Sequence, residues 1–216
     1  GKLLENFNGI AFVGGFSYSD VLGSSNAWAF QINYNEEIKN NFNHFYNSEN
    51  KFLLGVCNGC QLLSNLGWLP KYKIIKNDSE RFESRYVKLI VPKNNSVFTK
   101  NMENTIFGMW SAHGEGKIVK DENIDCINNC EVAFSYLDYN NNVTEEYPFN
   151  PNGSEQGIAG LSSNNGRCLG IMPHPERSIK SWQLPYITPN IPKNTDTPWS
   201  ILFKNALDFC KNKDLN

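Results

Sequence analysis

The 216-residue sequence lacks a long hydrophobic run, and this shortage narrows the classes of protein it can belong to. No stretch approaches the roughly 20 apolar residues that a membrane-spanning helix needs, and the N-terminal residues lack the pattern of a secretory signal peptide. Basic residues form no runs and the net charge is −2, so neither nucleic acid nor a membrane is an expected partner. We therefore expect a globular, cytoplasmic protein.

Cysteine and histidine are scarce, with six and three residues. Disulfides are not expected, because the chain is long and carries no secretory signal. A structural zinc site needs two ligand pairs; Cys57-x-x-Cys60 could supply one, and the other candidate, Cys126-x-x-x-Cys130, lies in a polar stretch. Zinc binding and redox chemistry are therefore the weaker interpretations, and we expect no metal. A glycine-rich phosphate loop with a lysine is also absent, which argues against a nucleotide site in this chain.

The most informative segment is Gly55-Val-Cys-Asn-Gly-Cys-Gln61, which follows a strand-like run and precedes a helix-like run. A cysteine between two glycines at such a junction is the cysteine version of the nucleophile elbow. The glycines relieve the clashes that a Cβ would create in the sharp turn. Cys57 would lie at a helix N-terminus, where we expect the dipole and the free N–H groups to favour thiolate over thiol.

Only three histidines can serve as the base for Cys57. His44 falls on the polar side of an asparagine-rich helix and is expected to be a solvated surface residue. His174 lies in Met172-Pro-His-Pro-Glu-Arg177, just past a buried strand, and Glu176 could fix its tautomer. These residues predict a Cys–His–Glu triad of Cys57, His174 and Glu176.

Strand and helix signals alternate in the first third of the chain, which predicts a parallel sheet covered by helices. One helix is expected to follow Ser24 or Ser25 as its N-cap and to run through Phe45. The expected strands of this core are Ile10–Val13, Phe52–Val56 and Leu169–Met172.

Shorter, partly antiparallel strands are expected in the middle of the chain. A C-terminal helix should begin after Thr197-Pro198, since proline is favoured at the first helical position. The expected additional strands cover Val87–Val91, Thr105–Trp110, Val132–Leu137 and Gly157–Leu161.

The elbow and His174-Pro-Glu176 resemble the class I, or triad, glutamine amidotransferases. Further segments are more closely similar to the glutaminase domains of phosphoribosylformylglycinamidine synthases of the long, single-chain form, and the resemblance runs from about Leu3 to Phe209. These segments are Phe12-Val-Gly-Gly-Phe-Ser-Tyr18, Ser79-Glu-Arg-Phe-Glu83, His113-Gly-Glu-Gly116, Asn150-Pro-Asn-Gly-Ser154, Gly157-Ile-Ala-Gly-Leu161 and Asp196-Thr-Pro-Trp199.

The resemblance implies an α/β fold with a flavodoxin-like, open, mostly parallel sheet flanked by helices and an appended, partly antiparallel region. It implies that residues 1–216 are one glutaminase domain, the C-terminal part of a larger synthase. Such a domain would hydrolyse glutamine through a cysteinyl thioester and pass ammonia to an ATP-dependent synthetase that makes formylglycinamidine ribonucleotide for purine biosynthesis. ATP and magnesium are expected in that synthetase region, and no cofactor is expected in this domain.

The resemblance also assigns supporting residues. The backbone N–H groups of Gly15 and Asn58 would form the oxyanion hole. Gln61 and His113 are candidates for binding the glutamine substrate.

Two departures from the family pattern stand out. Ser19 replaces a glycine that is usual near the oxyanion site, and the family's opening strand and helix are not found before Ile10. We therefore expect the first βα unit to be missing from this sequence. A class I amidotransferase of another pathway and a standalone γ-glutamyl cysteine hydrolase remain the alternative functions.

Four charged residues in or next to the family-like segments have two possible interpretations each. Arg81 and Glu83 alternate with Arg85 in a strand-like run, where a solvated face with ion pairs is favoured over contact with substrate. Glu115, between two glycines, could contact a partner domain or stabilise a loop.

Overall fold

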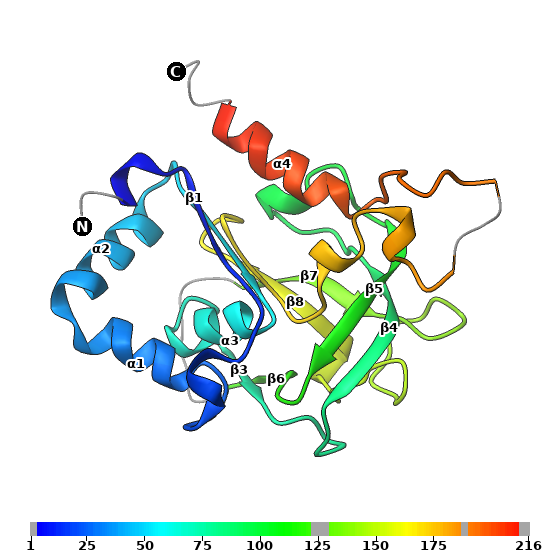
Figure 1. The fold of residues 1–216 in the computed structure, drawn as a ribbon, viewed down its shortest axis with the longest axis horizontal. Helices are drawn as coiled ribbons and strands as arrows, with labels where there is room; N and C mark the ends of the chain where they lie inside the picture. Colours follow the sequence, from blue (N-terminus) through cyan, green and yellow to red (C-terminus); the bar gives the residue numbers. More distant parts are fainter. Residues whose placement is uncertain (1–3, 122–129, 187–189, 212–216) are drawn as a thin grey trace.

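A computed structural model describes residues 4–121, 130–186 and 190–211 of the chain. Within these residues, one large sheet has the strand order β1-β2-β9-β8-β7-β4-β5, and a small second sheet pairs β3 with β6. Figure 1 shows α1, α2 and α3 on the side of β1, and the β4–β5 pair at the opposite end of the fold. The strands are β1 (Gly9–Phe12), β2 (Phe52–Val56), β3 (Tyr72–Ile75), β4 (Glu83–Ile90), β5 (Ile106–His113), β6 (Lys117–Lys120), β7 (Glu131–Tyr136), β8 (Ile158–Ser163) and β9 (Cys168–Ile171).

Helices cover both faces of the parallel strands. Phe12 of β1 packs its ring against Trp28 and Phe42 on the same face as α3. On the opposite face, Phe52 of β2 packs against Phe209 of α4. The α-helices are α1 (Asn26–Tyr34), α2 (Glu36–Asn47), α3 (Asn58–Asn65) and α4 (Ser200–Lys211). The short 3-10 helices are η1 (Leu4–Asn6), η2 (Ser17–Asp20), η3 (Val97–Thr99), η4 (Glu155–Gly157), η5 (Pro175–Arg177) and η6 (Ser181–Gln183).

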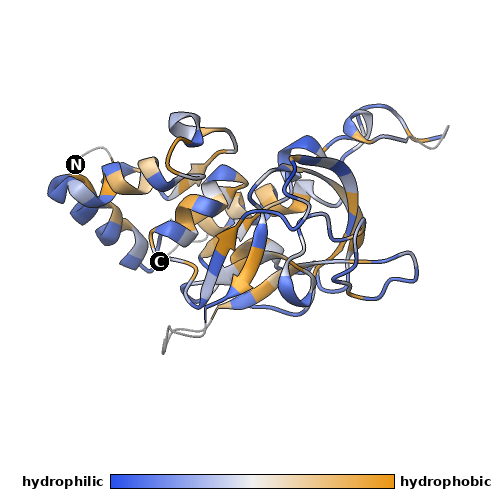
Figure 2. Cartoon of the chain, turned by 90° about the horizontal axis from the view of Figure 1, so that it is seen from below, coloured by the Kyte–Doolittle hydropathy of each residue, from blue (hydrophilic) through white to orange (hydrophobic). Residues whose placement is uncertain are grey.

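The core lies between the strands and these helices, and Figure 2 shows hydrophobic residues gathered on the central strands while the loops are mostly hydrophilic. Leu53, Leu63 and Leu169 are fully buried there, as is Trp199, whose ring packs on Phe134. Burial of one such side chain stabilises the fold by roughly 1.5–3 kcal/mol. The helix expected after Thr197-Pro198 is confirmed, since α4 begins at Ser200.

The expectation of a mostly parallel sheet is wrong. Among the strands of the described residues, the pairs β1–β2 and β2–β9 are parallel, whereas the other neighbouring strands of the large sheet pair in antiparallel fashion. The turn between β8 and β9 explains why these two strands are antiparallel. Its residues Asn164, Asn165 and Gly166 all have positive φ angles. An Asn-Gly pair between two strands favours a tight hairpin, and a hairpin makes its two strands antiparallel.

Two further expectations are corrected in the helical region. The single helix through Phe45 is two helices, because Asn35 leaves the helical conformation and its side-chain Oδ1 accepts a hydrogen bond from the N–H of Ile38 at 3.1 Å. Ser25 does occupy the position before α1, yet its hydroxyl makes no cap there. It donates instead to the carbonyl oxygen of Asn58 at 2.6 Å. The strands β3 and β6 had no counterpart in the expected elements.

Candidate functional site

Cys57 lies between β2 and α3, at the sharp turn predicted for a nucleophile elbow. Its backbone has φ 52° and ψ −106°, a conformation that is costly for a residue with a side chain. The turn is held by the N–H of Cys57, which donates to the carbonyl oxygen of Ile171 at 2.8 Å. A Cβ at Gly55 would lie 2.5 Å from the carbonyl oxygen of Gly59, and one at Gly59 would lie 2.0 Å from that of Phe12. Both glycines are therefore required for α3 to approach the strands this closely.

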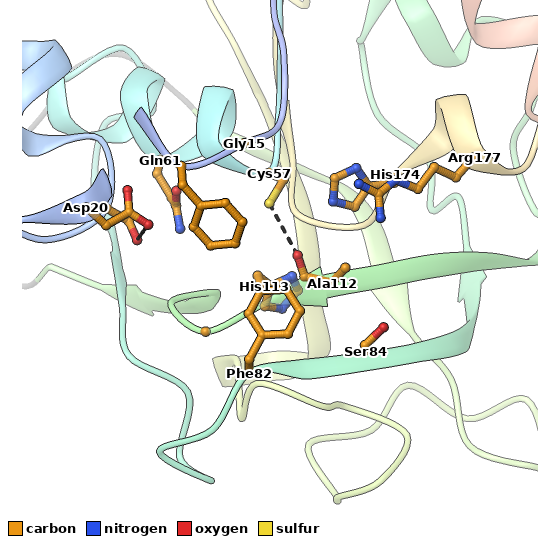
Figure 3. A pocket seen from close by; sticks show the side chains of 13 residues that line it. Gly15, Asp20, Cys57, Gln61, Phe82, Ser84, Ala112, His113, His174 and Arg177 are labelled. Atoms are coloured by element: carbon orange, nitrogen blue, oxygen red, sulfur yellow. Dashed lines mark hydrogen bonds between the residues drawn. The ribbon is translucent and has the colours of Figure 1, made fainter. Parts of the chain in front are cut away.

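The thiol of Cys57 does not have the lowered pKa expected from its place at a helix N-terminus. Burial raises its pKa to about 11, and this effect exceeds the opposing one of the Asn58 N–H. The Sγ–H group faces the carbonyl oxygen of Ala112, with 3.6 Å between sulfur and oxygen (Figure 3). The resting group is therefore a thiol, and a base must remove its proton when it reacts.

His174 lies against the same cavity and is positioned by both its backbone and its ring. Its N–H donates to the carbonyl oxygen of Trp110 in β5 at 2.7 Å. The ring is 2% exposed, and its Nδ1 lies 2.6 Å from Oε1 of Glu176. A carboxylate at Nδ1 favours the tautomer with the proton on that nitrogen. The Nε2 atom, which has no hydrogen-bond partner in the described part of the chain, is then free to accept a proton.

Glu176 is half-buried, with 45% of its side chain exposed. It lies in η5, where its backbone carbonyl oxygen accepts a hydrogen bond from the Gln183 side chain at 2.9 Å. The guanidinium of Arg177 approaches its carboxylate to 3.6 Å. Of the expected triad, Cys57 and His174 thus line one cavity, and Glu176 contacts the Nδ1 atom of His174.

The loop after β1 passes directly against the nucleophile and the base. A Cβ at Gly14 would lie 2.8 Å from the His174 ring and 3.4 Å from Cβ of Cys57. Gly15 follows with φ 154° and lines the same cavity as Cys57. Asn58 is the first residue of α3, so its N–H has no acceptor within the helix. Gly15 therefore lines the cavity and Asn58 directly follows Cys57, and their role as an oxyanion hole stays a prediction.

Gln61 lines the cavity, but its amide is already engaged by the protein. Its Oε1 accepts a hydrogen bond from Nδ2 of Asn58 at 2.9 Å, and its Nε2 donates to the carbonyl oxygen of Glu115. Gln61 thus ties α3 to the loop between β5 and β6. A direct contact with substrate stays a prediction for this residue.

His113 also lines the cavity, although its ring is held by buried neighbours. Its Nε2 lies 3.1 Å from Nδ2 of Asn152, and its Nδ1 lies 3.4 Å from Oγ of Ser111. Burial lowers its pKa to about 3, with a further contribution from His174, so the imidazole is neutral. These contacts make His113 a wall of the site, and its expected contact with substrate also stays a prediction.

Sequence reasoning missed the buried polar residues that shape this wall. The Asn77 side chain donates to the carbonyl oxygen of His113 at 2.8 Å and accepts from the N–H of Gly116 at 3.0 Å. Asn152 bridges His113 to the hydroxyl of Tyr136 at 3.0 Å. The sequence signal for Asn152 is its place in the family-like motif Asn150–Ser154.

The cavity has a volume of about 200 Å³. Figure 3 shows Phe82 in front of His113, and the rings of Phe16 and Phe82 contact each other with centroids 6.0 Å apart. Both rings are more than half exposed. The mouth of the cavity therefore has an apolar rim above a polar interior.

The structure also bears on the expectations for residues outside the cavity, for metal binding and for membrane-spanning helices. His44 is exposed, as predicted, and Cys60 is fully buried. Glu83 is buried and pairs with Arg85 at 2.5 Å, so the expected solvated face holds only in part. Residues that could hold a metal ion are not grouped anywhere in the described ranges, and Cys126 lies outside them. The helices of the described residues are also too short or too polar to cross a membrane.

Comparison with known proteins agrees with this geometry. The family of CobB/CobQ-like glutamine amidotransferase domains matches residues 2–210. Phosphoribosylformylglycinamidine synthase of Dictyostelium discoideum is 44% identical over 97% of this chain, which corresponds to 17% of that protein. A probable chloroplastic or mitochondrial phosphoribosylformylglycinamidine synthase of Arabidopsis thaliana is 42% identical over 95% of the chain and 16% of its own length.

A solved structure is also similar. The structure of PurLQS from Thermotoga maritima matches with a TM-score of 0.71 and 28% identity, covering 95% of this chain and 81% of the matched chain. The chain spans about a sixth of the length of the curated relatives. Because the family match covers nearly every residue, this chain belongs to the family of CobB/CobQ-like glutamine amidotransferase domains.

Proposed function

We propose that residues 1–216 form a glutaminase domain of a larger synthase, which hydrolyses glutamine to glutamate and ammonia. The ammonia supplies an ATP-dependent synthetase region of the same enzyme, which converts formylglycinamide ribonucleotide to its amidine in purine biosynthesis. The observation that carries the proposal is the placement of Cys57 at a strained elbow in one cavity with His174, whose Nδ1 faces Glu176 at 2.6 Å. The names of the relatives support the choice of pathway.

In the first step, His174 Nε2 takes the proton of the Cys57 thiol while the sulfur attacks the side-chain carbonyl carbon of glutamine. The carbonyl oxygen becomes an oxyanion, which the N–H groups of Gly15 and Asn58 stabilise. One such donor contributes roughly 3–4 kcal/mol to the transition state. The protonated His174 then gives its proton to the departing nitrogen, and ammonia leaves a γ-glutamyl thioester on Cys57.

In the second step, neutral His174 removes a proton from water, and the hydroxide oxygen attacks the thioester carbon. Cleavage of the carbon–sulfur bond releases glutamate, and the proton returns from His174 to the sulfur. Glu176 holds the imidazole orientation throughout and stabilises the imidazolium that forms in each step. General acid–base transfer of this kind contributes about 10²–10⁴-fold to the rate.

The partners of the domain follow from the same proposal. ATP and magnesium belong to the synthetase region, because the chain has no phosphate-binding loop with a lysine. The parallel strands β1, β2 and β9, with helices on both faces, support the finer assignment to a flavodoxin-like core.

Glutamate release by the protein of full natural length tests the proposal. The rate is measured with glutamine alone, and then with ATP and formylglycinamide ribonucleotide added. We expect these two compounds to stimulate glutamate release. If they have no effect, the pathway assignment is wrong and another acceptor must be sought.

A pair of cysteine variants tests the nucleophile. Cys57→Ala should lose glutamine-dependent synthesis and keep synthesis from added ammonia. Cys60→Ala is the matched control, because Cys60 lies one helical turn further on and is fully buried. It should keep both activities. Glutamine-dependent synthesis by Cys57→Ala at the wild-type rate would exclude the thioester mechanism.

A further inference from the structure

The proposed mechanism assigns no role to Asp20, a carboxylate that lines the cavity, or to Glu115, a second carboxylate nearby. Asp20, in η2, lines the cavity together with Ser24 and Gln61. In Figure 3, Asp20 and Gln61 are drawn on one side of Cys57, and His174 on the other. Glu115 stands behind Ser24, whose N–H donates to its Oε2 at 3.2 Å.

Neither carboxylate has a cationic partner. Within the described ranges, no lysine, arginine or histidine forms an ion pair with Asp20 or Glu115. The Ser24 hydroxyl donates to Oδ2 of Asp20 at 3.3 Å, but Oδ1 is buried without any hydrogen-bond partner. A buried carboxylate oxygen without a donor is destabilising. The Ser24 hydroxyl and the Ser25 N–H stabilise the carboxylate, and Oδ1 remains as an unused acceptor.

The electrostatics agree with that geometry. Burial raises the pKa of Asp20 and the negative charge of Glu115 adds to the rise, although hydrogen bonds from Ser24 and Ser25 oppose it. The charge of Asp20 in turn contributes to the raised pKa of Cys57, so the carboxylate acts across the cavity on the reacting sulfur. A cation bound beside Asp20 would relieve both repulsions.

A separate observation shows that the cavity is built for a polar ligand. The Nε2 atom of His174 belongs to a side chain that is 2% exposed, and it also lacks a partner. The cavity thus has one unsatisfied polar atom beside the nucleophile and another at Asp20. A ligand with an amide at one end and an ammonium group at the other matches both.

We propose that Asp20, supported by Glu115, binds the α-ammonium group of the glutamine substrate and thereby selects α-amino acid amides over simple amides. This assignment rests on the proposed glutaminase function. A metal ion fits the site less well, because three or more metal-ligating side chains are not grouped here in the described part of the chain. Asp20 is a specificity-determining residue in this scheme and takes no part in bond breaking.

The test compares L-glutamine with glutaramate, which has the same carboxamide chain but no amino group. Glutamate or glutarate release is measured in the protein of full natural length with ATP and the ribonucleotide present. The wild-type protein should prefer glutamine in kcat/KM, by about 10- to 100-fold for the loss of one charge-assisted hydrogen bond. Asp20→Asn should raise KM for glutamine by a similar factor and leave the two substrates nearly equal. Because the comparison is a ratio within each protein, a partly unfolded variant does not imitate this result.

Asp78→Asn is the matched control, since Asp78 is an exposed carboxylate that pairs with Lys117 at 2.7 Å outside this cavity. It should keep the wild-type preference. If wild-type protein uses glutamine but Asp20→Asn still discriminates as well as wild type, the assignment of Asp20 is wrong and the proposed function stands. If wild-type protein releases no glutamate from glutamine, the proposed function fails, and the assignment of Asp20 fails with it.

Discussion

The Cys57 thiol should be protonated in the substrate-free protein, and this can be measured directly. Burial raises its pKa from an ordinary value of 9.0 to about 11. At pH 8, about one molecule in a thousand would then carry a thiolate, against about one in ten for an unperturbed thiol. The two-unit difference corresponds to about 2.7 kcal/mol in favour of the protonated form.

Alkylation by iodoacetamide reports this ionisation, because only the thiolate reacts. The rate at Cys57 is followed by peptide mass spectrometry between about pH 6 and pH 10, in the protein of full natural length without glutamine. It should rise about tenfold per pH unit and reach no plateau below pH 10. Cys168 is an internal control, because it is fully buried and its pKa is raised to about 12.

The histidine variant sharpens the same experiment. The sulfur of Cys57 faces the carbonyl oxygen of Ala112 in the resting structure, and burial is the largest cause of its raised pKa. His174→Ala should therefore leave the pH profile of alkylation unchanged while it abolishes glutamine turnover. A plateau with a midpoint below pH 8, lost in His174→Ala, would refute this reasoning and reveal a preformed thiolate–imidazolium pair.

Three further predictions concern residues around the site. Glu176→Gln should lower kcat for glutamine about 10- to 100-fold with little change in KM, because the imidazolium loses a charged partner; an unchanged kcat in steady-state assays would contradict this. Ser19→Gly should raise the free energy of unfolding by about 1 kcal/mol, because Ser19 has φ 55°, whereas Ser200→Gly at the start of α4 should lower it, as calorimetry can show. Asn152→Ala should cost about 1–3 kcal/mol in urea unfolding, since the His113 ring loses its donor; a midpoint equal to wild type would argue against that contact.

The nucleophile elbow could be predicted from the sequence because its requirements are local. Two glycines and a cysteine within seven residues determine how closely α3 approaches β1 and β2. The strand Phe52–Val56 was also predicted with its observed bounds, since its apolar residues are bounded by the turn. The prediction of a thiolate failed for a different reason. The helix N-terminus was visible in the sequence, whereas the burial that outweighs it depends on the whole fold.

The polar wall of the site could not be predicted in the same way. Asn77 and Asn152 both form hydrogen bonds with His113, which is 36 positions from the first and 39 positions from the second in the sequence. In an asparagine-rich chain, composition does not distinguish such buried residues from surface ones. The break at Asn35 was more accessible, because asparagine is a favoured N-cap within an otherwise helical pattern.

The antiparallel strands, expected as an appendage, form part of the site itself. Among the described strands, β5 ends the order of the large sheet and pairs with β4, while its other edge forms an isolated bridge from Trp110 to His174. The carbonyl oxygen of Trp110 on that edge accepts the N–H of His174, and the carbonyl oxygen of Ala112 faces the thiol of Cys57. Residues two apart in a strand direct their carbonyl groups to the same side. One strand therefore aligns the base and the nucleophile together, although the two residues follow different strands of the parallel core. A displacement of β5 would move its contacts with Cys57 and with His174 at the same time. The position of Cys57 relative to His174 therefore depends on β5 as well as on the pairing of β2 with β9.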